Sequence, residues 1–271
     1  VGMFAKVIVD ASGRGMLVGR QMRMIEKDPV FNQYAVHAWF TDLDKGDDHT
    51  RDHIHIYFLT VERGWVWQIP ITEEITSVGV VVDKSVFSEF HADIEAYFNA
   101  QLQTNSNLAH TMRNANRINE FKSEGDYSYS MRNFVGNGYL LVGDAARFVD
   151  PIFSSGVSIA LYSAKYASEC IVAAFEKNEF GTAVFQPYED RLRQGAGVWY
   201  EFIRLYYKLL PLFTRFIANP EYRLQVLQLL QGEVFDRSEV PVLDAMRNYI
   251  ETVEKSSSHI FRPQLADIPL E

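Results

Sequence analysis

Apolar residues alternate with polar ones, or gather in short runs, through the first half of the chain, as is typical of strands. Residues 4–9 form an apolar, β-branched run that ends in Asp-Ala-Ser-Gly, which predicts a strand entering a turn. Residues 33–41 and 53–60 alternate and predict two more strands. Residues 64–71 and 76–82 predict an antiparallel pair joined by a short polar connection. Together these segments predict an antiparallel sheet.

Helical spacing dominates the second half of the chain. An earlier helix is predicted over residues 88–99, with Ser88 as its N-cap. Residues 116–129 are expected to form a return strand and loops. A further helix is expected at residues 157–177, and the chain is expected to be helical from residue 188 onward. Within this later part, the helical segments are 200–210, a stretch that ends at 218, 222–230 and 240–253. The end, residues 256–271, contains Ser and Pro and is expected to be loose.

Residues 138–156 carry the most chemical information. An apolar strand at 139–142 leads into a turn with an acid, Gly143-Asp144, and a loop through Pro151. Ser154-Ser155-Gly156, called the gate below, then opens a long apolar helix. A glycine lets a ligand approach the backbone closely, and a helix start offers unpaired N–H groups and the positive end of its dipole. The segment therefore predicts a site for a ligand with hydroxyl groups and delocalised negative charge.

Three motifs resemble those of one protein family. Residues 148–156 read Phe-Val-Asp-Pro-Ile-Phe-Ser-Ser-Gly, residues 65–70 read Trp-Val-Trp-Gln-Ile-Pro, and residues 10–14 read Asp-Ala-Ser-Gly-Arg. The first resembles the second flavin-binding motif of the flavoprotein monooxygenase superfamily. In their details, order and spacing, all three resemble the flavin-dependent halogenases. The resemblance covers residues 7–174, and beyond them only a helical C-terminal region is shared.

This resemblance implies a mixed α/β (α+β) fold of the flavoprotein monooxygenase type, with a partial FAD-binding domain, an antiparallel substrate-side sheet and a helical C-terminal region. Residues 1–15 and 136–180 are expected to be the remaining parts of the FAD-binding domain. Residues 16–135 are expected to form the substrate domain, and residues 181–271 the helical region.

The resemblance also implies roles for individual residues. Residues of three turns are expected to bind FAD. They are Asp10, Ala11, Gly13, Gly143, Asp144, Pro151, Gly156 and Val157. Asp144 would accept hydrogen bonds from the ribityl hydroxyls. Amides at the helix start, those of Ser155 and Gly156, are expected to bind the halide. A wall between flavin and substrate is expected from Trp65, Trp67, Pro70 and Phe153.

Each of these residues also has a purely structural interpretation. Asp10 and Asp144 could terminate strands and cap turns, as aspartates at such positions commonly do. Ser155 could be an ordinary N-cap, and the two tryptophans could be core aromatics. The flanking motifs favour the functional interpretation of Asp144 most strongly.

Phe153 narrows the subtype that the resemblance implies. Tryptophan-type halogenases have a glutamate three residues before the gate glycine, where this chain has Phe153. The difference indicates the group that acts on phenol- or pyrrole-like rings, which are often attached to a carrier protein.

A strand–Gly-x-Gly-x-x-Gly–helix unit, which binds the pyrophosphate in flavoproteins of this type, does not occur in the sequence. Gly13, Gly15 and Gly19 have the wrong last spacing for it. The chain is therefore expected to be the C-terminal portion of a longer polypeptide. The lysine that relays the oxidised halogen in halogenases is expected in the other portion, so no catalytic residue is assigned here and the fragment alone is expected to be inactive.

The implied activity is that of an FAD-dependent halogenase, a biosynthetic oxidoreductase that uses reduced FAD, O₂ and chloride or bromide on an electron-rich ring. A separate flavin reductase would supply the reduced FAD. One alternative is a monooxygenase or a geranylgeranyl-reductase-like enzyme that uses no halide, against which the Trp-x-Trp-x-Ile-Pro motif argues. The other alternative is a truncated, non-catalytic flavoprotein fold that acts as a binding module.

Composition and charge exclude several other classes of protein. A hydrophobic fraction of 47% argues against disorder, and a net charge of −9 argues against nucleic acid as a partner. The single cysteine, Cys170, excludes an internal disulfide and fits a reducing, cytoplasmic compartment. No apolar run is long enough for a transmembrane segment.

Two further clusters invite functional interpretations that the pattern does not favour. His49, His53 and His55 lie without a nearby Cys or convergent acid, so they are expected to face solvent and no metal site is assigned. Aromatic residues around Trp199 and Tyr207 are expected to pack along an amphipathic helix, with a lid or docking surface as the alternative.

Overall fold

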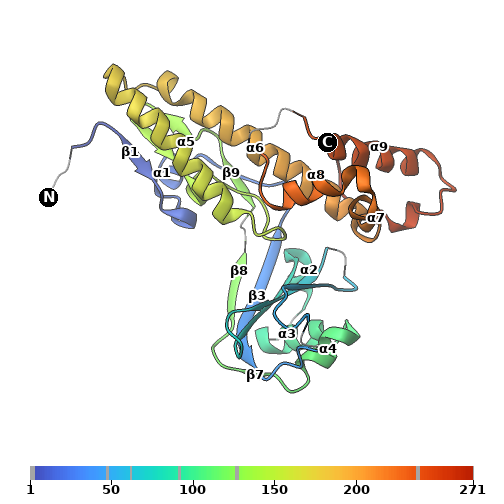
Figure 1. Cartoon of the computed structure of the whole chain (residues 1–271). Helices are drawn as coiled ribbons and strands as arrows, with labels where there is room; N and C mark the ends of the chain where they lie inside the picture. The colour runs from blue at the N-terminus through green and yellow to red at the C-terminus, as the bar shows by residue number, and fades with distance from the viewer. Residues whose placement is uncertain are drawn as a thin grey trace. The chain divides into compact units, whose positions relative to one another are not determined.

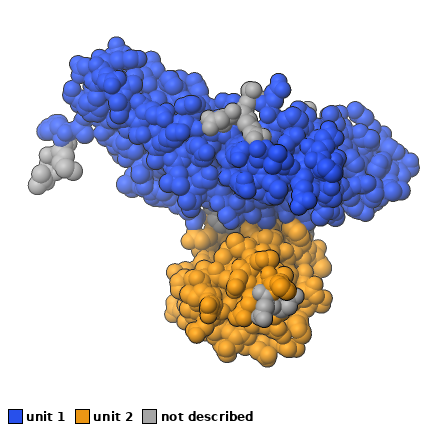
Figure 2. Space-filling model, viewed as in Figure 1, with its two compact units in different colours: residues 1–30, 128–271 blue, residues 31–127 orange. Residues whose placement is uncertain are grey.

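The computed structural model describes residues 4–46, 49–61, 63–90, 93–125, 128–235 and 239–270. The chain forms two compact units, shown in different colours in Figure 2. Unit 1 comprises residues 1–30 and 128–271, and unit 2 comprises residues 31–127. These units are defined by packing alone, so the division into flavin, substrate and helical domains stays a prediction.

Unit 1 contains two small three-stranded sheets. In the first, β1 (Ile8–Asp10) lies at the edge and pairs in parallel with β11 (Tyr139–Leu141), which pairs antiparallel with β10 (Val135–Gly136). The second sheet is antiparallel, in the order β12 (Arg147–Phe148), β9 (Tyr129–Met131), β2 (Ile25–Lys27). The first residues of the chain thus pair with strands more than 100 positions later.

Two long helices, α5 (Gly156–Lys177) and α6 (Thr182–Leu209), pack against each other in unit 1 (Figure 1). The side of α6 that carries Trp199, Phe202 and Tyr207 is buried, so the expected packing of these aromatics is confirmed. The other helical segments of unit 1 are η1 (Gly13–Gly15), α1 (Leu17–Gln21), η2 (Gly143–Ala145), η3 (Leu210–Leu212), α7 (Thr214–Ala218), α8 (Pro220–Leu230), α9 (Pro241–Lys255) and η4 (Arg262–Gln264).

Unit 2 is an antiparallel sheet with helices on one face. Its strands follow the order β4-β5-β6-β3-β7, and β8 also pairs with β3. Even-numbered residues of β3, among them Val36 and Phe40, pack in one core with Tyr97 and Phe98 of α3. The elements are β3 (Gln33–Thr41), β4 (His55–Phe58), β5 (Trp65–Pro70), β6 (Thr76–Asp83), α2 (Lys84–Glu89), α3 (Ile94–Leu102), α4 (Ser106–Met112), β7 (Asn116–Arg117) and β8 (Lys122–Gly125).

The predicted mixed α/β class, antiparallel sheet and helical C-terminal region are confirmed. The strand predicted at 33–41 forms with those bounds, and β5 and β6 pair antiparallel as expected. The helix predicted from 157 begins one residue earlier, at Gly156.

Two predictions about local structure are wrong. Ser88 is not an N-cap, because it lies inside α2. The helix that carries Tyr97 is α3, which begins at Ile94. Asp93 caps α3, because its side chain accepts a hydrogen bond from the amide of Ala96. The tail is also better ordered than expected, since the amide of Ala266 donates to the carbonyl of Lys208 and Ile268 is buried.

Within the described part of the chain, no helix combines the length and apolar character that crossing a bilayer would require.

Candidate functional site

Several residues predicted to bind FAD lie at or just after the carboxyl ends of the parallel strands β1 and β11, namely Asp10, Ala11, Gly13, Gly143 and Asp144. Asp10 ends β1 opposite Leu141, and the amide of Val142 donates to the carbonyl oxygen of Asp10 over 3.0 Å. The turns that follow the two strands, η1 and η2, contact each other. Parallel strands commonly present ligand sites at this edge, because the loops after them converge there.

Asp10 organises the first of these turns. Its Oδ1 accepts hydrogen bonds from the amide and hydroxyl of Ser12, at 3.0 and 2.5 Å, and its Oδ2 accepts from the amide of Val18 at 2.7 Å. Burial opposes ionisation of Asp10, but these hydrogen bonds outweigh it and lower its pKa. Both oxygens thus serve the turn itself, and a direct contact of Asp10 with FAD stays a prediction. Gly13 in this turn has φ +58°, and a Cβ built on it would meet no described atom within 4 Å.

Gly143 and Asp144 form the second turn. Gly143 has φ +57°, and its amide donates to the hydroxyl of Ser163 over 2.8 Å, which ties the turn to α5. Asp144 is half-buried, and its carbonyl oxygen accepts a hydrogen bond from the hydroxyl of Tyr129 at 2.7 Å. Burial raises the pKa of the Asp144 carboxyl, and the positive charge of Arg14 opposes that shift in part.

The gate places Asp144 beside the first residue of α5. A Cβ built on Gly156 would lie 3.2 Å from the Phe148 ring and 4.0 Å from Oδ1 of Asp144. Ser154 has φ +53°, a left-handed conformation that few non-glycine residues adopt, and it turns the chain into the helix. Ser155 is buried and occupies the N-cap position of α5, but its side chain makes no capping hydrogen bond.

A fully buried carboxylate, Asp150, lies just before the gate. Its Oδ1 accepts hydrogen bonds from the amide of Ile152 at 2.8 Å and from the hydroxyl of Tyr207, on α6, at 3.2 Å. No role at the flavin site was assigned to either residue from sequence. An acid inside the apolar run Phe-Val-Asp-Pro is the signal that could have drawn attention to Asp150, whereas nothing local identifies Tyr207 as its partner.

Phe153, a predicted wall residue, packs against α6. Its ring stacks on Phe202 with centroids 4.7 Å apart and meets Tyr206 edge-on at 4.9 Å. The residue at the position where tryptophan-type halogenases have a glutamate therefore belongs to an aromatic cluster.

The other predicted wall residues, Trp65, Trp67 and Pro70, belong to β5 in unit 2. The two indoles lie on the same face of β5 with ring centroids 5.9 Å apart. Trp65 is buried and Trp67 is half-buried. Their service as a wall next to the flavin stays a prediction.

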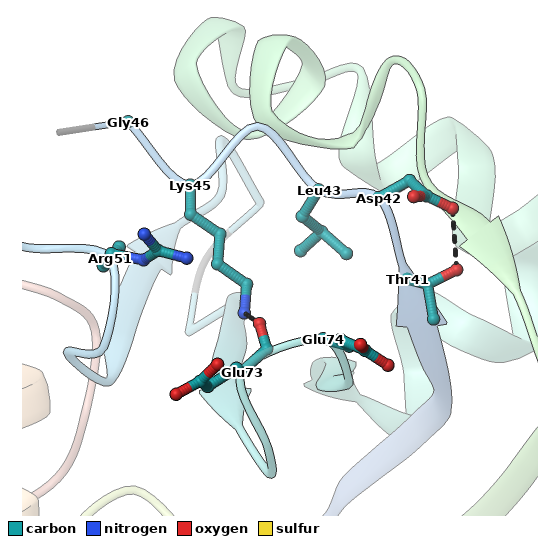
Figure 3. A pocket seen from close by; sticks show the side chains of 8 residues that line it. All are labelled: Thr41, Asp42, Leu43, Lys45, Gly46, Arg51, Glu73 and Glu74. Carbon is teal, nitrogen blue, oxygen red and sulfur yellow. Dashed lines mark hydrogen bonds between the residues drawn. The ribbon is translucent and has the colours of Figure 1, made fainter. Parts of the chain in front are cut away.

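A surface hollow of about 630 Å³ in unit 2 is lined by charged residues of both signs (Figure 3). Figure 3 shows the Lys45 side chain reaching the Glu73 backbone, where its Nζ donates to the carbonyl oxygen over 2.7 Å. Its lining is Thr41, Asp42, Leu43, Lys45, Gly46, Arg51, Glu73 and Glu74. None of these eight was predicted as a site residue.

His53 and His55 do not gather with other metal-binding side chains among the described residues. The rings of His53 and His55 lie 6.4 Å apart, and His55 hydrogen-bonds the carbonyl of Thr50. Across the described residues, no group of three or more His, Cys, Asp or Glu side chains could hold a metal ion.

Residues 3–211 match the protein-family model described as Tryptophan halogenase. The chain belongs to the tryptophan halogenase family. Its relatives in this family include a 1H-pyrrole-2-carbonyl-(peptidyl-carrier protein) chlorinase of Pseudomonas fluorescens, 47% identical over 268 residues, which covers 97% of this chain and 60% of the relative. A 1H-pyrrole-2-carbonyl-(peptidyl-carrier protein) brominase of Pseudoalteromonas luteoviolacea is 31% identical over 255 residues, covering 93% of this chain and 62% of the relative.

Solved structures of the tryptophan halogenase family share the fold. A flavin-dependent brominase superposes with a TM-score of 0.85 at 28% identity, over 94% of this chain and 65% of that one. The chondrochloren halogenase, a myxobacterial FAD-dependent enzyme, superposes with a TM-score of 0.69 at 29% identity, over 88% of this chain and 57% of that one. The chain spans about 60% of the length of the two curated relatives described above.

Proposed function

We propose that the complete protein is a flavin-dependent halogenase that acts on a pyrrole ring attached through its 2-carbonyl group to a peptidyl-carrier protein. The observation that carries this proposal is the position of the Asp144 carboxylate beside Gly156, where α5 begins, at the carboxyl ends of β1 and β11. The substrate class comes from the 47% identical relative, a chlorinase of that substrate. Its higher identity, against 31% for the brominase, favours chloride over bromide.

The chain's own residues fit FAD. Burial disfavours the ionised form of the Asp144 carboxyl group. Hydroxyl groups of a ligand that donate hydrogen bonds to Asp144 would therefore stabilise its ionised form. Gly13 borders open space, and the absence of a side chain at Gly156 keeps the approach to Asp144 open. Asp144 would hold the ribityl hydroxyls, and Ala11, Gly13, Gly143, Pro151 and Val157 would line the cofactor, as the motifs imply.

The halide would lie at the N-terminus of α5. The first amides of a 22-residue helix point out of its end with a partial positive charge, which favours an anion. In this proposal the amides of Ser155 and Gly156 hold the halide. Ser155 is almost fully buried, so water would screen the attraction between an anion and these amides only weakly.

The cofactor supplies the oxidation: reduced FAD with O₂ provides the oxidising equivalent that turns halide into an electrophile. This chain's residues bind and orient the reactants and exclude water. Trp65, Trp67, Pro70 and Phe153 would separate flavin from substrate. Because Phe153 carries no carboxyl group, position 153 offers no acid to assist the halogenating species.

The proposal includes the partners and location of the protein. A flavin reductase would supply reduced FAD, and the carrier protein would present the pyrrole. A cytoplasmic location is supported by a single cysteine, Cys170, which the structure shows as a free thiol.

Mass spectrometry of the product tests the proposal. The protein made from its complete gene is incubated with FAD, a flavin reductase, NADH, O₂ and the pyrrolyl carrier protein, with chloride or bromide as the only halide. We expect a product that carries the halogen supplied. A hydroxylated product, or an unchanged substrate under conditions where FAD is bound and reduced, would contradict the proposal and favour a halide-independent activity.

A further inference from the structure

One face of the unit 2 sheet is partly open, since some of its side chains are exposed while others, such as Trp65, are buried. Residues directly opposite one another in antiparallel strands point to the same face, so the register assigns each side chain to one side. One face packs Val36, Phe40 and Val80 against the helices. The other carries large apolar side chains that stay exposed, including Trp39 at 42%, Phe58 at 38% and Ile56 at 37%.

A single row crosses this partly open face. Ile56 lies opposite Trp67, Trp67 opposite Gly79, Gly79 opposite His37, and His37 opposite Lys122. The row therefore runs from an apolar end, over an indole and an imidazole, to a charged edge.

Gly79 allows the Trp67 indole to lie across the row. A Cβ built on Gly79 would come within 2.1 Å of the Trp67 ring, so the indole occupies the space that any other residue would fill. The indole Nε1 donates to the hydroxyl of Ser77 over 3.1 Å, which fixes the orientation of the ring. With its only donor used, the indole offers its exposed part as an apolar aromatic surface.

His37 borders that surface. The imidazole centroid lies 5.6 Å from that of Trp67, with 43° between the ring planes. Burial lowers the pKa of His37; the charge of Glu124 opposes this shift and that of Lys122 adds to it. The lowered pKa of His37 favours the neutral imidazole, which keeps one unprotonated ring nitrogen as an acceptor.

We propose that Trp67 and His37 form a binding site for a small heteroaromatic ring that carries an N–H group. The ring packs against the Trp67 indole and donates its N–H to the imidazole of His37. This assignment rests on the proposed function and deepens it, because a pyrrole is such a ring. A neutral acceptor set in an apolar aromatic surface selects for one uncharged donor, since a purely apolar ring would leave the imidazole without its hydrogen bond and an anion would gain no charge partner from it.

Isothermal titration with two matched probes tests the site. Pyrrole-2-carboxamide and furan-2-carboxamide have similar shapes, but only the first has a ring N–H. For the protein made from its complete gene, we expect pyrrole-2-carboxamide to bind about tenfold more tightly, as the loss of one buried hydrogen bond implies. In His37→Phe we expect this preference to disappear, and in His37→Gln, whose amide oxygen can accept, to return in part.

Two further variants separate a local effect from a general one. Gly79→Ala should displace the Trp67 ring and weaken both probes, whereas Lys122→Ala, at the exposed end of the row, should change neither. Circular dichroism confirms that each variant is folded, and the ring protons of His37 in NMR spectra report directly on ligand contact. Equal binding of the two probes by the wild type, no binding of either, or an unchanged preference in His37→Phe would overturn the site. None of these results bears on halide transfer at the gate, so the proposed function would fail separately, in the product assay.

Discussion

Asp144 and Gly156 face each other across the start of α5, so that a methyl group on Gly156 would stand 4.0 Å from the Asp144 carboxylate. One residue follows β11 and the other begins α5. Their proximity brings a charged acceptor to the anion-binding end of a helix. A ligand that spans both must offer hydroxyl donors to the first and negative charge to the second, and the reduced flavin proposed here does both.

Replacing Asp144 by Asn should change cofactor binding and stability in opposite directions. FAD affinity should fall by about 1 kcal/mol, since a charge-assisted hydrogen bond becomes a neutral one of about half its strength. The protein without FAD should become more stable, because burial disfavours the charged form of Asp144. Flavin titration and thermal unfolding measure the two effects. A loss of stability without loss of FAD affinity would remove Asp144 from the cofactor site.

The raised pKa of Asp144 predicts a pH dependence for FAD binding. FAD hydroxyls would stabilise the ionised carboxylate, so affinity should be full above the pKa of Asp144 and fall as the pH drops through it. Burial raises that pKa, so the loss should begin at a higher pH than for an ordinary aspartate. Flavin titrations across the acid range test this, with Asp144→Asn as the control that should lack the step. An identical pH profile for the variant would contradict the assignment.

Gly156→Ala should impair halide and flavin binding more than folding. The new methyl group would lie 3.2 Å from the Phe148 ring, a tight contact that a small shift relieves, but it would also stand in the approach to Asp144. We expect at least a tenfold loss of turnover, equivalent to about 1.4 kcal/mol, with a melting temperature close to that of the wild type. The control is Gly197→Ala in α6, where a methyl group meets no described atom within 4 Å. Similar turnover in the two variants would be incompatible with close ligand approach at the gate.

Tyr207→Phe should show whether α6 positions the gate loop. The variant loses the hydrogen bond to the fully buried Asp150, which should cost about 1–3 kcal/mol of the free energy of unfolding. Because Asp150 also binds the amide of Ile152, we expect the KM for chloride to rise along with this loss. The matched control is Tyr162→Phe, on α5, whose ring packs on Phe235. If the KM for chloride stays unchanged while stability falls, the contact is structural only.

Local patterns were sufficient to predict much of the fold. Apolar and polar residues alternate at 33–41 because a strand packs one of its two faces in a core, and β3 forms at these residues. The prediction of Ser88 as an N-cap was wrong although a serine before an apolar helical pattern is typical of that position. The N-cap is Asp93, five residues later, whose carboxylate accepts a hydrogen bond from the amide of Ala96. The tail could not be predicted, since its order depends on Lys208, whose Nζ donates to the carbonyl oxygen of Ile268, 60 positions away.

The sequence identified the turns that carry the candidate site, but it did not identify the residues that support those turns. Motifs mark Asp144 and Gly156 because both are adjacent to glycine-rich turns in sequence, and the structure brings them together. Tyr207 lies 57 positions from Asp150, and its hydroxyl has no sequence mark that separates it from neighbouring tyrosines. His37 was overlooked because its relation to Trp67 exists only through the register of β3, β5 and β6.

The edge position of β1 bears on how this polypeptide behaves in isolation. Its Ile8 and Val9 are 55% and 44% exposed, and among the described strands only β11 pairs with it. A bare, apolar edge is a template on which another copy can add its own strand. Purified at high concentration, these 271 residues should self-associate through β1, and a charged substitution such as Val9→Lys should keep them dispersed.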